Sequence, residues 1–155
     1  MSTDPTSRLE QLGLELPDIP APAAAYQPTA RTGELVLTAG QLPVVGGALL
    51  ATGKLGTDLA TDEGAQLART AALNVLAAAA SAAGGLDRVR VVKLTVFVAS
   101  SPDFVEQHLV ANGASELIAD VLGDNGVHAR SAVGVATLPL DSPVEVEAIV
   151  EVLAR

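Results

Sequence analysis

Runs of β-branched and apolar residues predict five strands along the chain. ELVLTAG, residues 34–40, ends at Gly40, and GGALLATG, residues 46–53, follows as a short strand. RVRVVKLTVFVAS, residues 88–100, is long and rich in valine, which is typical of the central strand of a sheet. Residues 128–155 hold two further apolar runs joined by a Pro-containing turn, so we expect the chain to end in a β-hairpin.

Two longer segments repeat their apolar residues with the period of an α-helix. In residues 61–85, Thr61 is a candidate N-cap, and the two acidic residues after it suit the first turn of a helix. In residues 101–126, Ser101 is the candidate cap and Gly123 lies just past the expected end. The elements follow the order β, β, α, β, α, β, β, so we expect two helices to cover one face of a four- or five-stranded mixed sheet.

The N-terminal segment departs from this pattern. A short helical repeat covers residues 6–12, and a proline-rich stretch follows it. Its prolines are Pro17, Pro20, Pro22 and Pro28. Proline fixes the backbone and removes an N–H donor, so we expect residues 1–33 to form an extended arm after the helical patch rather than a strand in mid-sheet. No second domain is indicated: we expect one domain over residues 1–155, with the helical patch and the start of the arm at 1–20.

The side chains of the final hairpin can be assigned to faces if residues 139–142 form its loop. Val133 and Val135 would then pack on the helices. The opposite face would hold Arg130, Ala132, Gly134, Ala136, Glu145, Glu147, Ile149 and Glu151. Small residues in the middle of that face leave room for another backbone, and no further helix remains to cover it. We therefore expect a second subunit against this face, with Arg130 at the rim of the interface.

Composition narrows the classes of function. Lys and Arg number 9 against 18 acidic residues, a net charge of −9, whereas nucleic-acid binding needs clustered cations. The nearest cluster is RVRVVK, residues 88–93, where a regular strand would place Arg88 and Arg90 opposite Lys93, so we expect no nucleic-acid partner. Cysteine is absent, which excludes disulfides and thiolate metal sites. With two Phe, one Tyr and no Trp, the core must be Ala, Val and Leu, with little room for a bulky cofactor.

The sequence also argues against export and membrane insertion. Its start, MSTDPTSRLEQLG, lacks the basic region and apolar run of a secretory signal. The longest apolar stretch, residues 71–85, is interrupted by Asn74 and Ser81 and is too short for a membrane span. We therefore expect a soluble, cytoplasmic protein with no membrane partner.

Several local patterns imitate known sites without completing them. GALLATGKL resembles a phosphate-binding loop, but Ala48 stands where the first glycine is required and Leu55 follows the lysine. His108 and His128 have no partner at metal-ligand spacing, so we expect surface or capping roles for them. Ser131 lacks the His and Asp of a hydrolytic triad. The residues therefore indicate neither a metal nor a cofactor.

Four stretches, in order, resemble the RidA/YjgF family of enamine/imine deaminases. The first is YQPTARTGELVLTAGQLP, residues 26–43, and the second is VVKLTVFVASSPDF, residues 91–104. The others are ARSAVGVATLP, residues 129–139, and VEVEA, residues 144–148. The resemblance covers nearly the whole chain from about residue 20 onward. VANGASELI and HARSAVGV look closer to a less characterised branch of the family than to its best-known deaminases.

The resemblance implies an α+β fold like that of the small trimeric chorismate mutases. It also implies a homotrimer with the sheets facing inward, and hydrolysis of 2-enamine and 2-imino acids to 2-oxoacids and ammonia in clefts between subunits. Arg130 matches the arginine that binds the substrate carboxylate, and Glu145 matches the glutamate that holds the attacking water. Tyr26 matches an aromatic residue lining the cleft from the neighbouring chain, and Gly40 matches a glycine whose backbone faces the ligand. The hairpin register places Arg130 several residues from Glu145, so a ligand, a water or a neighbouring subunit must bridge them.

Three positions depart from the family pattern. Ala132, one of the implied substrate-binding positions, stands where many members have cysteine, Ala39 replaces a serine, and Gln-Pro follows Tyr26. An alternative is therefore a non-catalytic trimer that binds small carboxylates in the same cleft, in a regulatory or sensing role. The acidic chain argues against ribonuclease activity. Chorismate mutase activity needs several cations for a dianionic substrate, and Arg130 is the only one that this motif supplies.

Overall fold

The computed structural model describes residues 4–19 and 25–155. Its helices are α1 (Pro5–Gln11), α2 (Thr61–Ala83) and α3 (Gln107–Leu122), and its 3₁₀ turns are η1 (Leu86–Arg88), η2 (Gly123–Gly126) and η3 (Pro139–Asp141). Its strands are β1 (Thr29–Thr32), β2 (Leu35–Thr38), β3 (Val44–Val45), β4 (Ala48–Leu49), β5 (Val89–Ala99), β6 (Ala129–Val135) and β7 (Val144–Val152). The two long helices and the long central strand confirm the elements expected from the periodicity of the sequence.

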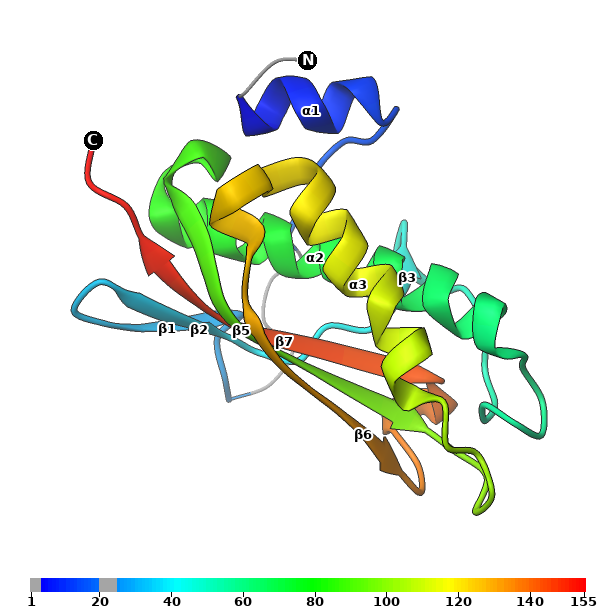
Figure 1. Cartoon of the computed structure of the whole chain (residues 1–155). Helices are drawn as coiled ribbons and strands as arrows, with labels where there is room; N and C mark the ends of the chain where they lie inside the picture. Colours follow the sequence, from blue (N-terminus) through cyan, green and yellow to red (C-terminus); the bar gives the residue numbers. More distant parts are fainter. Residues whose placement is uncertain (1–3, 20–24) are drawn as a thin grey trace.

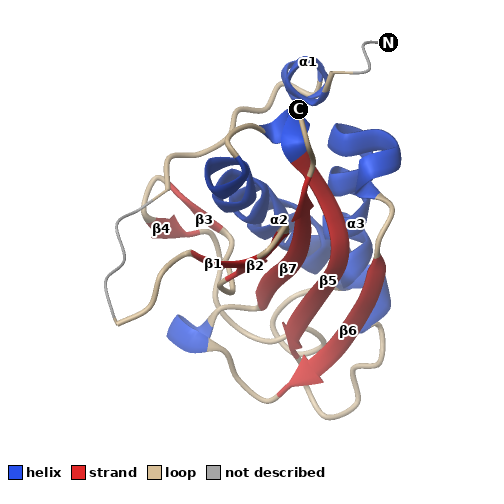
Figure 2. Ribbon diagram, turned by 90° about the vertical axis from the view of Figure 1, so that its left-hand side faces the viewer, coloured by secondary structure: helices blue, strands red, loops and turns tan. Residues whose placement is uncertain are grey.

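Five strands form one mixed sheet in the order β1-β2-β7-β5-β6. β5 pairs with β6 in parallel, and the other pairings are antiparallel. Figures 1 and 2 show α2 and α3 on one face of this sheet, with α1 lying over the helices on the side away from the strands. β3 and β4 make a separate two-stranded ribbon. The expected α+β architecture, a mixed sheet with two long helices on one face, is confirmed.

α2 and α3 pack closely because small residues line their contact. The buried positions of α3 include Ala111, Gly113 and Ala114, opposite an alanine-rich α2. A Cβ atom on Gly113 would overlap the main-chain oxygen of Ala65 in α2 and lie 2.6 Å from its carbonyl carbon. Main chain in a helix cannot move aside as a side chain can, so this crossing requires glycine.

Gly113→Ala is therefore expected to lower the free energy of unfolding by about 1–3 kcal/mol, the cost of overpacking a core. Without the contact, alanine in a helix would instead stabilise the protein by about 1 kcal/mol over glycine. Urea unfolding measures the difference. Gly64→Ala is the matched control, because its Cβ would meet the end of the Leu55 side chain, Cδ1, at 2.7 Å, and a smaller loss is expected. A Gly113→Ala variant as stable as the wild type would contradict this account of the helix crossing.

The helix starts differ from those expected. α2 is preceded by Ala60, whose N–H donates to Glu63 Oε1 at 3.1 Å, while Thr61 Oγ1 instead donates to Glu106 at 2.7 Å. α3 begins at Gln107 rather than after Ser101. Ser101 lies in the loop before it, where its N–H donates to Leu55 O at 2.9 Å and its Oγ donates to Asp103 Oδ1 at 2.9 Å.

The final two strands are not paired with each other, so the expected hairpin register is wrong. β5 lies between them, and its Leu94 stands opposite Arg130 of β6. Because Leu94 is fully buried under the helices, Arg130 and every second residue after it face the helices too. Val133, expected to face the helices, lies on the opposite face and is 41% exposed. For β7 the expected facing holds, since its valines are buried and its glutamates are not.

A β-bulge in β5 changes the placing of the basic cluster. The register shifts between Val91 and Lys93, so Arg90 and Lys93 lie on the same face of the strand, not on opposite faces. Arg90 pairs with Glu151 of β7 at 2.8 Å. Arg88 belongs to η1, and its guanidinium donates to the main-chain oxygens of Ala83 and Leu153. The three cations therefore do not combine into one patch.

The N-terminal expectations have mixed outcomes. The helical patch is present as α1, and the segment expected to stay extended contributes β1 at the edge of the sheet. Pro20 and Pro22 of the expected arm lie outside the described residues. The predicted strand at 46–53 is limited to β4, paired with β3. Among the helices in the described parts of the chain, none is long and apolar enough to cross a membrane.

Candidate functional site

Arg130 lies near the start of the edge strand β6, and its side chain turns toward α3. Nη1 donates to Asn112 Oδ1 at 2.9 Å and to Ser115 Oγ at 3.1 Å. Nη2 donates to the main-chain oxygen of His108 at 3.3 Å. Within residues 4–19 and 25–155 the Nε–H and one Nη2–H have no partner. α3 thus holds the guanidinium in place and leaves it two donors, as many as a bidentate carboxylate accepts.

Ala132 is the next residue of β6 on the same face as Arg130. It packs at the margin of the core, opposite Val96 of β5. Gly134 follows, and a Cβ there would lie 2.8 Å from Nε2 of Gln107 at the start of α3. The small residues of β6 therefore leave room for α3. The expectation that they leave room for the backbone of a second subunit is wrong.

Ser115 links Arg130 to His128, a contact that the sequence did not predict. Ser115 Oγ lies 2.9 Å from His128 Nε2, and His128 Nδ1 lies 2.6 Å from Gly126 O. The expectation of a surface or capping role for His128 missed this link. Asn112 and Ser115 share a helix face at i, i+3, and His128 precedes Arg130 by two positions, but this spacing does not show that the two segments meet.

Glu145 lies on the sheet face away from the helices, beside Gly40. Its neighbours in β7 are buried valines on the helix side. A Cβ atom on Gly40 would overlap the Glu145 carboxylate, so a larger residue there would force this side chain to move. Burial, and then the charge of nearby Glu147, raise the pKa of Glu145. Such a carboxyl group holds a proton more readily than an exposed one, as suits a general base. In the described part of the chain, no group of three His, Asp or Glu side chains could hold a metal ion.

Tyr26 and Gly40 line one cavity of about 650 Å³. Its walls come from the segment before β1, the end of β2, the β3–β4 ribbon and the middle of α2. Asn74 of α2 braces the wall by donating to the main-chain oxygens of Leu42 and Val44. Tyr26 is 62% exposed at its mouth. This volume is in the range of small-molecule sites.

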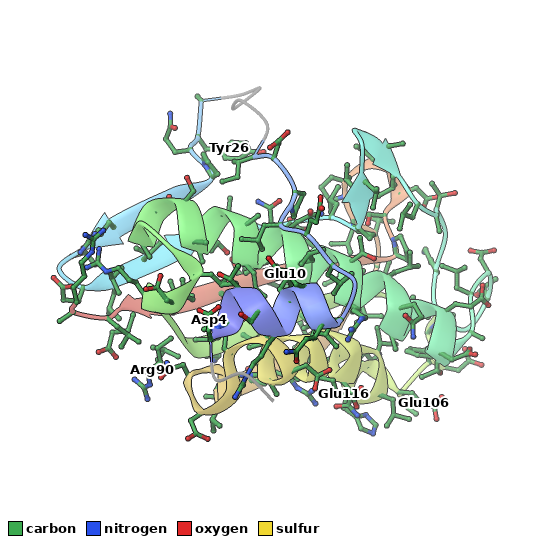
Figure 3. The ribbon with its side chains drawn as sticks, turned by 90° about the horizontal axis from the view of Figure 1, so that it is seen from above. Asp4, Glu10, Tyr26, Arg90, Glu106 and Glu116 are labelled. Atoms are coloured by element: carbon green, nitrogen blue, oxygen red, sulfur yellow. The ribbon has the colours of Figure 1, made fainter. Side chains whose placement is uncertain are left out.

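The sequence-predicted residues fall into two groups within one chain. Tyr26, Gly40 and Glu145 lie around the end of β2, whereas Arg130 and Ala132 lie on β6. β5 separates β7 from β6, and Glu145 and Arg130 project from opposite faces of the sheet. Figure 3 shows Tyr26 beyond α2 and, across the molecule, Glu116 of α3, the residue after Ser115. A single chain therefore does not bring Arg130 and Glu145 to one small ligand.

The sheet face away from the helices carries exposed apolar side chains among charged ones, and nothing in the described residues covers it. Leu37 of β2 is 43% exposed and Val133 of β6 is 41% exposed. Phe97 and Ile149, on the strands between them, are half-buried on the same face. Lys93 and Glu147 lie there too, so the apolar side chains form only part of this surface.

Comparison with known proteins gives consistent results. The family model described as "YjgF/chorismate mutase-like, putative endoribonuclease" matches residues 6–152. Protein TCP17 of Trypanosoma cruzi is 51% identical over 149 residues, which cover 94% of this chain and 92% of that protein. The crystal structure of Atu1372 from Agrobacterium tumefaciens, a protein of unknown function, has a TM-score of 0.88 and 47% identity over 96% of this chain and 92% of that one. Escherichia coli TdcF with bound serine has a TM-score of 0.61 and 27% identity over 87% and 93%.

Proposed function

Because the chain belongs to the YjgF/chorismate mutase-like (RidA/RutC) family, we propose that it hydrolyses reactive 2-enamine and 2-imino acids to 2-oxoacids and ammonia. The observation that carries the proposal is the guanidinium of Arg130, fixed by α3 with two N–H donors uncommitted. A related protein, TdcF, holds serine, whose carboxylate is the group that such donors bind. The raised pKa of Glu145 supports its role as the base.

The proposed cleft needs two chains. Since Arg130 and Glu145 project from opposite faces of the sheet, one subunit would supply Glu145 and Gly40, and its neighbour Arg130 and Ala132. The exposed apolar side chains on the sheet face away from the helices, such as Leu37 and Val133, support a homotrimer with the sheets facing inward. Tyr26, which lies with Gly40, would line the same cleft. Sedimentation equilibrium tests this directly, and we expect a particle of three times the chain mass. A monomer at micromolar concentration would contradict the intersubunit cleft.

The proposed chemistry follows from these positions. Arg130 binds the substrate carboxylate and so fixes the adjacent imine carbon. An enamine first takes a proton at its β-carbon, which gives the protonated imine. Glu145 accepts a proton from a water molecule as the water oxygen bonds to the imine carbon, which gives a neutral carbinolamine. Glu145 returns that proton to the nitrogen, the C–N bond breaks with its electron pair on nitrogen, and the hydroxyl group loses its proton to Glu145 as it becomes the carbonyl, so that ammonia and the 2-oxoacid leave. Imines hydrolyse in water unaided, so positioning of water and one base supplies the needed acceleration.

The function can be tested with 2-aminoacrylate, generated from serine by a dehydratase and trapped by semicarbazide. We expect the protein to reduce the trapped product and to raise the rate of pyruvate formation. The alternative, a non-catalytic trimer that binds small carboxylates, is favoured by Ala39 and Ala132, which offer no side-chain donor. Unchanged trapping together with binding of 2-oxobutyrate would support that alternative. Unchanged trapping without binding would contradict both.

A further inference from the structure

A directed chain of hydrogen bonds runs from Arg130 across α3 to the start of β6. Arg130 Nη1 donates to Ser115 Oγ at 3.1 Å, Ser115 Oγ contacts His128 Nε2 at 2.9 Å, and His128 Nδ1 contacts Gly126 O at 2.6 Å. α3 packs against β6 and η2, and His128 lies in the short link between those two elements (Figure 1).

Hydrogen-bond chemistry fixes the direction of the chain. The oxygen of Gly126 only accepts, so His128 Nδ1 carries the proton and, in the neutral ring, Nε2 is an acceptor. The Ser115 hydroxyl therefore donates to Nε2, and its lone pairs accept from Arg130. Each donor polarises the next acceptor, which strengthens the whole chain.

The same pair, a serine next to a histidine, is found as nucleophile and base in hydrolases. Here Nη1 of the Arg130 guanidinium donates a hydrogen bond to a lone pair of Ser115 Oγ at 3.1 Å. Ser115 is also a residue of the middle of α3, partly buried against β6. An ester carbon would have to approach the side of Oγ that Arg130 occupies, so the geometry favours a positioning role.

We propose that Ser115 and His128 hold Arg130 in the orientation that binds a carboxylate, and that protonation of His128 weakens this grip. The statement that Arg130 binds a carboxylate rests on the function proposed above. Protonated His128 is a donor at both nitrogens, so the Ser115 hydroxyl can no longer donate to Nε2. The imidazolium and the Arg130 guanidinium then both direct N–H groups at one neutral oxygen, and their like charges repel. Arg130 loses one of its three contacts to α3, and with it a fixed orientation.

Other charged groups on the surrounding elements stay the same in the His128 and Ser115 variants below. They are Arg8 of α1, Lys93 of β5, His108, Glu116 and Asp120 of α3, Asp124 of η2 and Arg130 of β6. The chain contains 2 histidines, so His108, whose main-chain oxygen also accepts from Arg130, gives a matched control for the side chain of His128.

Calorimetric titration with 2-oxobutyrate tests the proposal, in a Glu145→Gln background so that this carboxyl group does not titrate. We expect the background protein to bind about three- to tenfold more weakly at about pH 5.5 than at about pH 8, the range over which histidine gains a proton. Adding His128→Gln, which keeps a neutral acceptor, should remove the drop between the two pH values. Adding His108→Gln should keep the drop. Adding Ser115→Ala should weaken binding about two- to tenfold at both pH values.

Two results would overturn the proposal: a drop of equal size with His128→Gln, or unchanged affinity with Ser115→Ala. A measurement without ligand separates this from the proposed function. The ¹H–¹⁵N signal of Arg130 Nε, assigned by its loss in Arg130→Lys, should differ between about pH 8 and about pH 5.5 and should not differ in His128→Gln. If that signal is insensitive to pH, the coupling is absent whether or not a carboxylate binds. If the signal shifts but 2-oxobutyrate does not bind, the coupling between His128 and Arg130 is supported and the proposed carboxylate site is contradicted.

Discussion

Glu145→Gln is expected to reduce the rate of imine hydrolysis by about 10²–10⁴-fold, the contribution of a positioned general base. Glutamine has nearly the same shape and fits beside Gly40, but its amide cannot accept a proton from water. The measurement is the initial rate of ammonia release from an imine generated in place by an amino-acid oxidase, with wild type and variant at equal concentration. Full activity in Glu145→Gln would remove this residue from the proposed mechanism.

The same substitution should increase stability near neutral pH. Burial raises the pKa of Glu145, so the folded protein disfavours the charged form. In the unfolded chain the group ionises near its ordinary pKa, so wild-type stability falls as the pH rises from that value toward the raised one. Glutamine has no such loss. Urea unfolding should therefore show a stabilised variant at about pH 7 and little difference at about pH 3.

Glu147→Gln provides the control for the charge next to Glu145. Removing that charge lowers the pKa of Glu145, because the repulsion between the two carboxylates contributes to the raised value. Activity should be kept, and the acid limb of its pH profile should move to lower pH. A profile that does not move would mean that a group other than Glu145 sets that limb.

Arg130→Ala is expected to weaken binding of 2-oxobutyrate by about 10²–10⁴-fold, because each lost charge-assisted hydrogen bond contributes about 1.5–3 kcal/mol. The fold should survive, since Arg130 is half-buried at the edge of the sheet and water can solvate the acceptors that it leaves on α3. Titration calorimetry and thermal unfolding measure the two effects on the same preparation.

Arg69→Ala is the matched control for Arg130→Ala. Arg69 of α2 is also a cation beside α3, where its Nη1 lies 3.9 Å from Asp120 Oδ2. We expect unchanged binding of 2-oxobutyrate and a stability change within about 1 kcal/mol, as for surface ion pairs. Equal affinity in wild type and Arg130→Ala would show that the carboxylate is bound elsewhere, or not at all.

The proposed cleft residues divide according to how directly the sequence specified them. Gly40 and Glu145 were both expected from motifs, and the structure brings them into contact, because β2 and β7 are neighbouring strands. Arg130 was expected on the face that carries Glu145 and instead lies on the helix face. The motif located both residues along the chain, but it contained no information about the strand that would separate them.

The hydrogen-bond partners of Arg130 could not be predicted from the sequence pattern. Asn112, Ser115 and His128 are ordinary polar residues of a helix face and a strand start, and nothing in their spacing requires them to meet. They meet because β6 pairs in parallel with β5, which turns Arg130 toward α3. The hydrogen-bonded chain therefore depends on the pairing of β6 with β5 instead of β7, which no local sequence signal predicts.

The sequence by itself determined the types of the main elements, their order, the alanine-rich core and the family. Periods of 2 and 3.6 residues are properties of neighbouring positions, so they survive whatever the strands later pair with. Only the tertiary structure decided which strands are neighbours and therefore which face each side chain of β6 occupies. Alternation along a strand tells which residues share a face, but the choice between faces is made by the partner strand and the packed helix, through burial of distant residues such as Leu94.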